Sequence, residues 1–399
     1  MTALDVTLPK GPVLGWASFL PRFGTRNASI ADWPNRQLVT SGRAAIYQAL
    51  LQSDLPPGSG VLVPTYHCPT MVAPVVQAGL NVHFVGIGED GLPQLESIDA
   101  KAVQACRAII VAHYFGFPKS LASVRAWCDE RGLALIEDCA HSYYGNAGER
   151  PVGGWGDFAT ASVTKFFPVS EGGLLVRASG KAIAAKLRRA GLKAQIKAWV
   201  DILELAARHR RLAGINTLLH FVFSLKRGDL NPSPATVASA PQRNAMPSSS
   251  SVDAMMRDCD MQRVAQKPVF ATRWLFRLLP SVWAVNRRRG NFSVYLEGLS
   301  NCPGARPIVR TLPLDAVPYV FPLWVDDSDR VYLRLRELKM PVHRWDRVWP
   351  STPQLTGDMG PLWSKHVLQL LCHQALSQKD VAQVCAAVVK LLDGEEDIA

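Results

Sequence analysis

The chain has 399 residues, of which 48% are hydrophobic and 19% charged, and its formal net charge is +11. This length exceeds a single compact core, so we expect a large domain and a smaller one. The ordinary hydrophobic content excludes extensive disorder. The excess of positive charge is compatible with a nucleic acid, an anionic membrane surface or an anionic small substrate.

Eight cysteines are spread along the chain without CxxC pairs or the Cys/His spacing of a zinc site. Their mostly apolar surroundings predict reduced, buried thiols in a cytoplasmic protein, with neither a disulfide framework nor a metal site. The first residues, MTALDVTLPK, lack the regions of a signal peptide, and no apolar run is long enough to span a bilayer. Neither secretion nor a transmembrane anchor is therefore expected.

Short β-branched runs alternate with amphipathic stretches between residues 41 and 176. The predicted strands are 60–66, 81–87, 108–116 and 133–140. The predicted helices between them are 44–53, 69–79 and 121–132. Because strand and helix alternate, the connections are crossovers, and we expect a largely parallel sheet with helices on both faces.

A strongly basic segment follows, with twelve Lys or Arg against two acidic residues from Arg177 to Arg227. Apolar residues recur at helical spacing over 181–228, which predicts one or two basic helices. Such helices either pack on the sheet or across a dimer with a solvated cationic face, or lie on a membrane surface. A nucleic-acid partner is not expected, because the chain contains no recognition module.

The remaining chain predicts a linker and a second domain. Residues 231–251 are rich in Pro, Ser and Ala, as loops are. Helical patterns at 269–299, 327–340 and 377–392 and a strand-like run at 316–325 then predict an α+β unit. The expected division is a large α/β domain over 1–230, a linker over 231–260 and a small C-terminal domain over 261–399.

Polar residues follow the predicted strands, where open α/β sheets bind ligands. Ser41-Gly42 precedes a helix whose free amides suit a phosphate, although an ordinary N-cap shows the same pattern. Asp138 ends an apolar strand and needs a cation or several donors nearby. Lys165 supplies either that cation or a cofactor ligand. Pyridoxal phosphate requires a lysine for a Schiff base, an acid at its pyridine nitrogen and an anion cradle, and all three occur here.

These motifs resemble the DegT/DnrJ/EryC1/StrS sugar aminotransferases, a group of fold-type I pyridoxal-phosphate enzymes. The matching stretches are SGRAAIYQAL, VLVPTYHCPTMVAPVVQAGLNVHFVGI, HYFGFP, LALIEDCAHSYYG, ASVTKFFPVSEGGLLV and HQALSQKDVAQV. They extend from residue 35 to residue 390, with a gap over 180–260. The resemblance implies a large domain with a mostly parallel sheet flanked by helices, and a smaller α+β C-terminal domain.

The resemblance also implies roles around the cofactor ring. Lys165 would form the Schiff base with pyridoxal 5'-phosphate and then move the proton to and from the substrate carbon. Asp138 would keep the pyridine nitrogen protonated, and His141 would lie close to the ring hydroxyl. A residue stacked on the ring is expected from the PTYHCPT turn, with His67 and Tyr66 as open alternatives.

The phosphate site implied by the resemblance departs from the family pattern. Its implied members are Gly42, Arg43, Thr160 and Ser162. Arg43 stands where threonine is usual, Thr160 where serine is usual, and Ser162 where an aromatic residue or histidine is common. The family also takes an asparagine from the neighbouring subunit of a homodimer, and Asn244 is the corresponding candidate.

The function implied is an aminotransferase that converts a keto group of a nucleotide-linked sugar to an amine during amino-sugar or polysaccharide biosynthesis, with glutamate as the expected donor. Related dehydratases lack the lysine, and Lys165 argues against them. The alternatives are a non-catalytic or regulatory protein on the same fold, since fold does not fix function, and an enzyme acting on another keto substrate.

Overall fold

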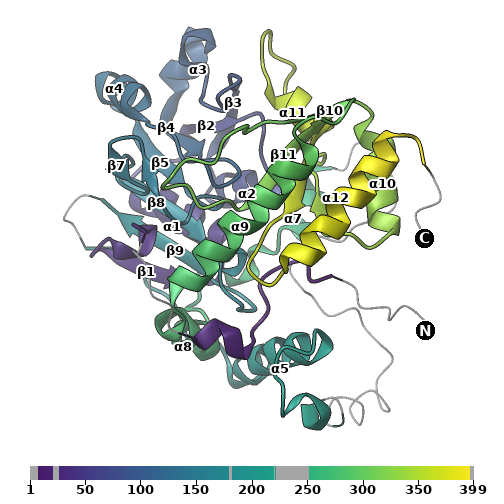
Figure 1. Cartoon of the computed structure of the whole chain (residues 1–399). Coiled ribbons are helices and arrows are strands. Elements are labelled where there is room, and N and C mark those ends of the chain that lie inside the picture. Colours follow the sequence, from purple (N-terminus) through teal and green to yellow (C-terminus); the bar gives the residue numbers. More distant parts are fainter. Residues whose placement is uncertain (1–7, 21–26, 179–181, 220, 222–250, 396–399) are drawn as a thin grey trace.

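The computed structural model describes residues 8–20, 27–178, 182–219, 221 and 251–395. These residues form two main sheets with helices around them (Figure 1). The large sheet has seven strands in the order β1-β9-β8-β5-β4-β2-β3, and the small sheet has four in the order β10-β11-β13-β12.

The large sheet lies within residues 36–177. Its strands are β1 (Arg36–Val39), β2 (Gly60–Pro64), β3 (Asn81–Val85), β4 (Cys106–Ala112), β5 (Ala134–Asp138), β8 (Phe158–Ser162) and β9 (Gly173–Arg177). Strands β8, β5, β4, β2 and β3 pair in parallel, and β9 runs antiparallel to both β8 and β1. Every strand except β9 therefore ends at the same edge, and the predicted largely parallel sheet is confirmed.

Three of the helices between these strands are those that the apolar spacing predicts: α1 (Gly42–Gln52), α2 (Pro69–Gln77) and α4 (Ala122–Arg131). The short helix α3 (Ala100–Ala105) was not predicted. Ser41 caps helix α1, since its hydroxyl oxygen accepts a hydrogen bond from the amide of Ala44 at 3.2 Å. A two-stranded ribbon, β6 (Asn146–Ala147) and β7 (Arg150–Pro151), lies between β5 and β8 in the chain.

The small sheet is antiparallel and belongs to the C-terminal part of the chain. Its strands are β10 (Ala305–Pro307), β11 (Val320–Val325), β12 (Val342–His343) and β13 (Val367–Leu371). Its helices are α9 (Ser281–Leu299), α10 (Ser328–Glu337), α11 (Gly360–His366) and α12 (Gln378–Leu392). The predicted helical stretch 269–299 divides into α8 (Phe270–Leu278) and α9 at Pro280, because proline cannot continue a helix.

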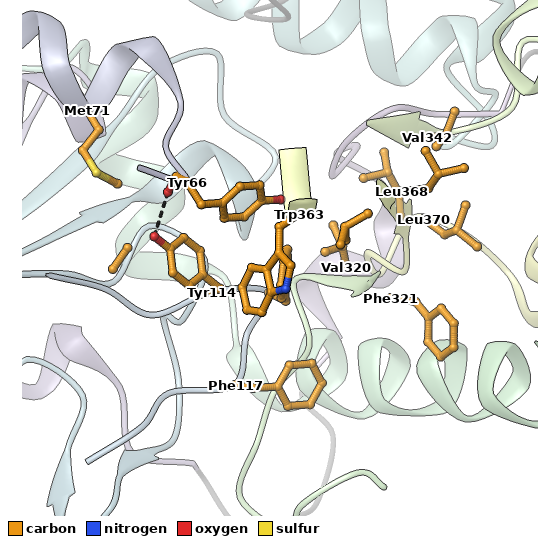
Figure 2. Packing of buried hydrophobic residues seen from close by; sticks show 14 of the residues in the cluster. Tyr66, Met71, Tyr114, Phe117, Val320, Phe321, Val342, Trp363, Leu368 and Leu370 are labelled. Carbon is orange, nitrogen blue, oxygen red and sulfur yellow. Dashed lines mark hydrogen bonds between the residues drawn. The ribbon is translucent and has the colours of Figure 1, made fainter. Parts of the chain in front are cut away.

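One hydrophobic cluster joins the two sheets (Figure 2). Tyr66 and Tyr114, which follow strands β2 and β4, lie beside Trp363 of α11, and the apolar side chains of β11 and β13 continue the cluster. The Tyr114 hydroxyl donates to the carbonyl oxygen of Tyr66 at 2.7 Å. Because this packing is continuous, residues of the small sheet are held against the carboxyl edge of the large one.

The basic segment differs in part from its prediction. Helix α5 begins only at Leu192 and ends at Arg208, whereas residues 182–190 form no helix, and Arg188 forms an isolated β-bridge with Gln266. Residues 222–250, which include most of the predicted linker, lie outside the described residues. The final part of that linker is a helix, α7 (Val252–Asp258), capped by Ser251 and held by the buried Met255. Among the described residues no helix has the length and apolarity to cross a membrane.

Candidate active site

The residues predicted for the site gather at the carboxyl edge of the large sheet. Ser41 follows β1, Tyr66 follows β2, and Asp138 is the last residue of β5. Lys165 lies one turn beyond β8, at the end of the short 3-10 helix η4 (Val163–Lys165). Strand β9 starts at this edge with Gly173, between Val39 and Ser162 in the register of the sheet.

Lys165 lies in an environment that disfavours its charge. Burial lowers the pKa of its amine below the usual 10.5, and smaller opposing effects come from Cys68 and Asp138. The amine nitrogen lies 5.0 Å from the centre of the Tyr319 ring and 5.9 Å from the centre of the Trp345 ring. A larger fraction of this amine is therefore neutral and nucleophilic than would be the case in water.

Asp138 is buried and has one carboxylate oxygen occupied. Its Oδ1 accepts hydrogen bonds from the amide of Ala140 at 3.0 Å and from the hydroxyl of Thr160 at 3.2 Å. Burial raises the pKa of Asp138 above its usual value, and the charge of Lys165 acts against that rise. Within the described residues Oδ2 has no hydrogen-bond partner, so it is free to accept a hydrogen bond from a ligand.

An aromatic wall surrounds Lys165 and His141. The His141 ring lies 4.4 Å from the Tyr319 ring and 4.7 Å from the Trp345 ring, measured between ring centres. Its Nδ1 accepts from the amide of Phe115, which leaves Nε2 as the ring donor. Burial, with smaller contributions from Lys165 and His343, holds the pKa of His141 well below its usual value. His141 is therefore neutral at physiological pH.

The structure separates the two candidates for the stacking residue. His67 is fully buried, with Nδ1 bonded to the Pro64 carbonyl oxygen, Nε2 accepting from the Trp349 amide, and its ring stacked on Phe84. The Tyr66 ring lies 5.0 Å from the Trp345 ring, on the wall described above. Tyr66 therefore belongs to the wall beside Lys165, whereas His67, although equally buried, packs against Phe84.

The start of α1 and the first residue of β9 form a close junction. A Cβ atom at Gly173 would lie 2.1 Å from the carbonyl oxygen of Ser41 and 2.8 Å from the amide nitrogen of Gly42, so only glycine fits. The Ser162 side chain lies next to Gly42, and its hydroxyl lies 3.2 Å from that of Thr164. The helix amides and these hydroxyls suit an anion.

The other predicted phosphate ligands are placed differently. The Thr160 hydroxyl donates to Asp138, so Thr160 orients the carboxylate instead of facing the start of α1. The Arg43 guanidinium donates to the carbonyl oxygen of Asp260 and lies 3.7 Å from its carboxylate, which leaves the amide of Arg43 at the helix start. Asn244 lies outside the described residues.

Arg288 of helix α9 fixes the backbone beside the lysine. Its guanidinium is fully buried and donates to the carbonyl oxygens of Lys165 at 2.6 Å and Pro318 at 3.1 Å, and to the side-chain oxygen of Gln374 at 2.9 Å. Gln374 in turn donates to the carbonyl oxygen of Phe166 at 2.6 Å. The small domain therefore holds the turn that carries Lys165.

The Glu-Gly-Gly turn is a second connection between distant segments. Glu171 forms an ion pair with Arg263 and accepts from the amide of Val269 at 2.8 Å. Its carbonyl oxygen accepts from the hydroxyl of Thr272. Glu171 thus binds the segment that enters α8, while the two glycines that follow allow β9 to start against α1.

Four residues near Lys165 have no counterpart in the sequence-based prediction: Cys68, Arg288, Tyr319 and Trp345. Three of them come from the C-terminal part of the chain, far from the motifs. Cys68 belongs to the PTYHCPT turn, and it is classified from the sequence only as a buried thiol. The only local signal for Cys68 in the sequence is Thr70, two residues later. The hydroxyl of Thr70 donates to the Cys68 sulfur at 3.1 Å.

The sheet topology defines an α/β protein with a mostly parallel central sheet, and similar solved structures share this fold. A structure of DesI in the presence of its TDP-sugar product has a TM-score of 0.61 and 17% identity, covering 92% of this chain and 83% of that one. A structure of 3-amino-5-hydroxybenzoic acid synthase has a TM-score of 0.60 and 14% identity, covering 91% and 88%. The predicted fold is confirmed.

Residues 34–220 match the model of the DegT/DnrJ/EryC1/StrS aminotransferase family. GDP-perosamine synthase of Vibrio cholerae is 30% identical over 198 residues, which are 47% of this chain and 54% of that protein. The dTDP-4-dehydro-2,3,6-trideoxy-D-glucose 4-aminotransferase of Saccharopolyspora spinosa is 28% identical over 182 residues, 44% and 47% of the two chains. The chain spans about half the length of the curated relatives it matches. Over the matched residues the chain is similar to this aminotransferase family.

Proposed function

We propose that the chain is a pyridoxal-phosphate-dependent aminotransferase that acts on the keto group of a nucleotide-linked sugar. The observation that carries the proposal is the electrostatic pair at the carboxyl edge: burial lowers the pKa of Lys165 and raises that of Asp138. Perturbed groups of this kind cluster at functional sites. The family match supplies the reaction class.

The donor set fits pyridoxal phosphate. A ring between Lys165 and Asp138 would find an amine for its aldehyde and a free carboxylate oxygen for its nitrogen. The start of α1, which Gly173 leaves uncovered by a side chain, and the Ser162 hydroxyl provide donors for a phosphate. The buried, neutral His141 and the aromatic wall provide ring surfaces.

The cofactor, when bound, supplies an electron sink for the carbanion formed at the substrate carbon. The residues of the chain do the rest. Lys165, with its lowered pKa, accepts and returns the proton of that carbon. Asp138 holds a proton at the ring nitrogen, and Thr160 keeps its Oδ1 in place. Arg288 fixes the backbone from which the lysine side chain extends.

An anionic sugar nucleotide is the substrate class that the charge and the relatives support. The net charge of +11 favours an anionic ligand, and the names of the two relatives described above refer to GDP-linked and dTDP-linked sugars. Glutamate is the proposed amino donor. A screen of keto-sugar nucleotides with glutamate tests the substrate class, and turnover of only a keto compound without a nucleotide would replace it.

Borohydride reduction followed by peptide mapping tests the role of Lys165. We expect the pyridoxyl label on the peptide that contains Lys165, and a label on another lysine would contradict the assignment. Lys165→Ala is expected to abolish both the label and transamination while the far-UV circular dichroism stays unchanged. Loss of the label with full activity would contradict the proposed chemistry itself.

We further propose a homodimer in which Asn244 completes the phosphate site of the neighbouring subunit, as the family resemblance implies. Complementation tests this arrangement: chains with Lys165→Ala are mixed with chains with Asn244→Ala. Hybrid dimers should regain activity in one of their two sites. A fully active monomer in sedimentation would contradict the dimer, and an active dimer without complementation would remove Asn244 from the site.

A cytoplasmic location is proposed as well. All eight cysteines of the chain are free, and most are buried. Free thiols in this number are typical of proteins in reducing compartments. Fractionation of cells that express the chain, with immunodetection of each fraction, tests the location.

A further inference from the structure

Helices α5 and α8 carry two exposed apolar stripes. On α5 the exposed residues are Leu192 and Ile196, at positions i and i+4, which are 75% and 58% exposed, and the half-buried Trp199 follows at i+7. The stripe on α8, at i, i+4 and i+8, consists of Phe270, Trp274 and Leu278. Phe270 is 53% and Trp274 42% exposed. Each helix therefore has a second apolar face besides the one that packs inward.

The two stripes form one surface. The Trp199 and Trp274 rings lie 5.8 Å apart between their centres, and the amide of Phe270 donates to the side chain of Gln195 at 2.7 Å. Figure 1 shows α5 and α8 together at one end of the molecule, at the bottom of the view. The inward faces, with Ala198, Ile202 and Leu275, form a core of their own with residues 13–14. Of the residues on this outward surface, Trp199 alone packs partly against that core.

Basic residues lie beside this surface. Arg189, Lys267 and Arg273 line an open hollow of about 370 Å³ together with Gln195. Among the described residues none of these three cations has an acidic partner within 4.0 Å. The acids of α5 are already paired, Asp201 with Lys197 at 2.6 Å and Glu204 with Arg208 at 3.2 Å. The hollow is therefore a cationic site next to exposed tryptophan and phenylalanine.

We propose that the α5–α8 surface binds the face of an anionic phospholipid membrane. The tryptophan and aliphatic side chains would enter the interfacial layer, and the three cations would take lipid phosphates in the hollow. A second copy of the chain fits less well, because a two-fold contact of this surface with itself would bring the same cations together. The helices lie on the membrane in this proposal and do not cross it.

Cosedimentation of the full chain with vesicles tests the proposal. We expect binding to phosphatidylcholine vesicles that contain phosphatidylglycerol and little binding to phosphatidylcholine alone, with a loss of binding as salt rises because exposed charges are screened. Equal binding to both vesicles, or none to the anionic ones, would overturn it. Inorganic phosphate should displace the chain no better than chloride at equal ionic strength, and specific displacement would identify a free-phosphate site instead.

Matched variants locate the surface. Phe270→Ser with Trp274→Ser should reduce the binding constant for anionic vesicles at least about tenfold, since the apolar area leaves the bilayer. Lys267→Gln or Arg273→Gln should each reduce it about fivefold. Leu333→Ser on α10, 56% exposed and remote from α5 in Figure 1, is the apolar control and should bind as the wild type does.

Two further measurements keep the test decisive. Thermal unfolding of each variant checks that the fold is intact, which is expected because all five substituted residues are exposed. Sedimentation without vesicles shows the oligomeric state. If the Phe270 and Trp274 changes dissociate an oligomer while vesicle binding stays unchanged, the surface is an interface between copies and the membrane proposal is overturned.

Discussion

The two faces of strand β5 carry adjacent buried carboxylates in opposite environments. Glu137 accepts from His113 Nε2 at 3.0 Å and from the amides of Gly153 at 2.6 Å, Trp155 at 2.9 Å and Gly156 at 3.3 Å. Burial alone would raise the pKa of Glu137, but these hydrogen bonds outweigh it and hold the pKa below the usual 4.5. On the other face Asp138 keeps one oxygen free, and burial raises its pKa.

Neighbouring residues of strand β5 thus have different roles: Glu137 stabilises the fold, and Asp138 is available to bind a ligand. Side chains alternate across a strand, so consecutive residues face different layers. On the Glu137 side every carboxylate oxygen is bonded, which fixes the 153–156 loop and stabilises the charge. On the Asp138 side the charge is left costly and one oxygen is unused, which suits a group that must receive a ligand.

The largest effect expected is that of Asp138→Asn on turnover. Asparagine keeps the shape but cannot hold a proton at the ring nitrogen, so kcat should fall about a thousandfold. The free energy of unfolding should change by less than about 1 kcal/mol, because the amide oxygen keeps the hydrogen bonds from Ala140 and Thr160 while a charge that burial disfavours is removed. Steady-state kinetics and urea unfolding check both values. Near-normal turnover would refute the role of Asp138.

Glu137→Gln, the same change one residue earlier, should act on stability. A glutamine amide would face the Gly153 and Trp155 amides and leave donors unpaired, at a cost of about 3–5 kcal/mol in the free energy of unfolding. Urea unfolding of the purified chain measures the loss. A Glu137→Gln chain that is as stable as the wild type but has reduced turnover would contradict the structural role of Glu137.

Arg288→Met should weaken catalysis through the position of Lys165. Without the guanidinium the carbonyl oxygen of Lys165 loses its donor, and a displacement of about 1 Å costs about a hundredfold in kcat. Arg288→Lys should recover part of that loss, since one donor can still reach the turn. The visible absorption of the bound cofactor and its pH dependence should shift in Arg288→Met. An unshifted spectrum with unchanged kcat would contradict the positioning role.

Ser162→Ala, on the Asp138 side of the sheet, is expected to have a smaller effect, which is on the affinity for the cofactor. Removing one hydroxyl next to the start of α1 should weaken cofactor binding about tenfold, which corresponds to one hydrogen bond to a charged group. Titration of the apoprotein with cofactor, followed by absorption, gives the dissociation constant. Thr164→Val, which removes the neighbouring hydroxyl, is the matched comparison. Unchanged affinity in both variants would place the phosphate elsewhere.

The smallest expected effects are two opposite changes of the free energy of unfolding with pH, one from Glu137 and one from Asp138. Because its folded pKa lies below 4.5, Glu137 contributes stability that is present above that pH and lost as pH falls through the folded pKa. Asp138 has a raised folded pKa, so the wild type loses stability relative to Asp138→Asn as pH rises above 3.8. Urea unfolding over a pH series measures both differences. Parallel curves for the wild type and both variants would contradict the comparison.

Much of the site was predictable because its polar residues follow the strands directly. The strand ending at Asp138 and the turn at Lys165 are local features, set by apolar runs and by the residues that interrupt them. Since parallel strands end at one edge, their neighbours in space follow from the topology. The choice between His67 and Tyr66 was not predictable, because their surroundings, Phe84 and Trp345, come from different elements.

The error in the basic segment has a physical reason of the same kind. Residues 182–190 have helical spacing, yet they form no helix. The Arg188 amide donates to the Ala265 carbonyl oxygen at 3.0 Å, and the Arg188 carbonyl oxygen accepts from the Lys267 amide at 2.7 Å. Local propensity favours a helix only weakly, and backbone bonds to a distant segment override it. The exposed stripes of α5 and α8 likewise became visible only when the buried faces were known.

Four strands of the large sheet, helices α1, α2 and α4, and the common edge near which Asp138 and Lys165 lie were predictable from the sequence. These depend on the periodicity of neighbouring residues and on the rule that parallel strands end together. The tertiary structure alone decided which side chains surround the lysine. Arg288, Tyr319 and Trp345 reach it from the small domain through packing between the two sheets, and contacts over more than a hundred residues leave no spacing pattern in the chain.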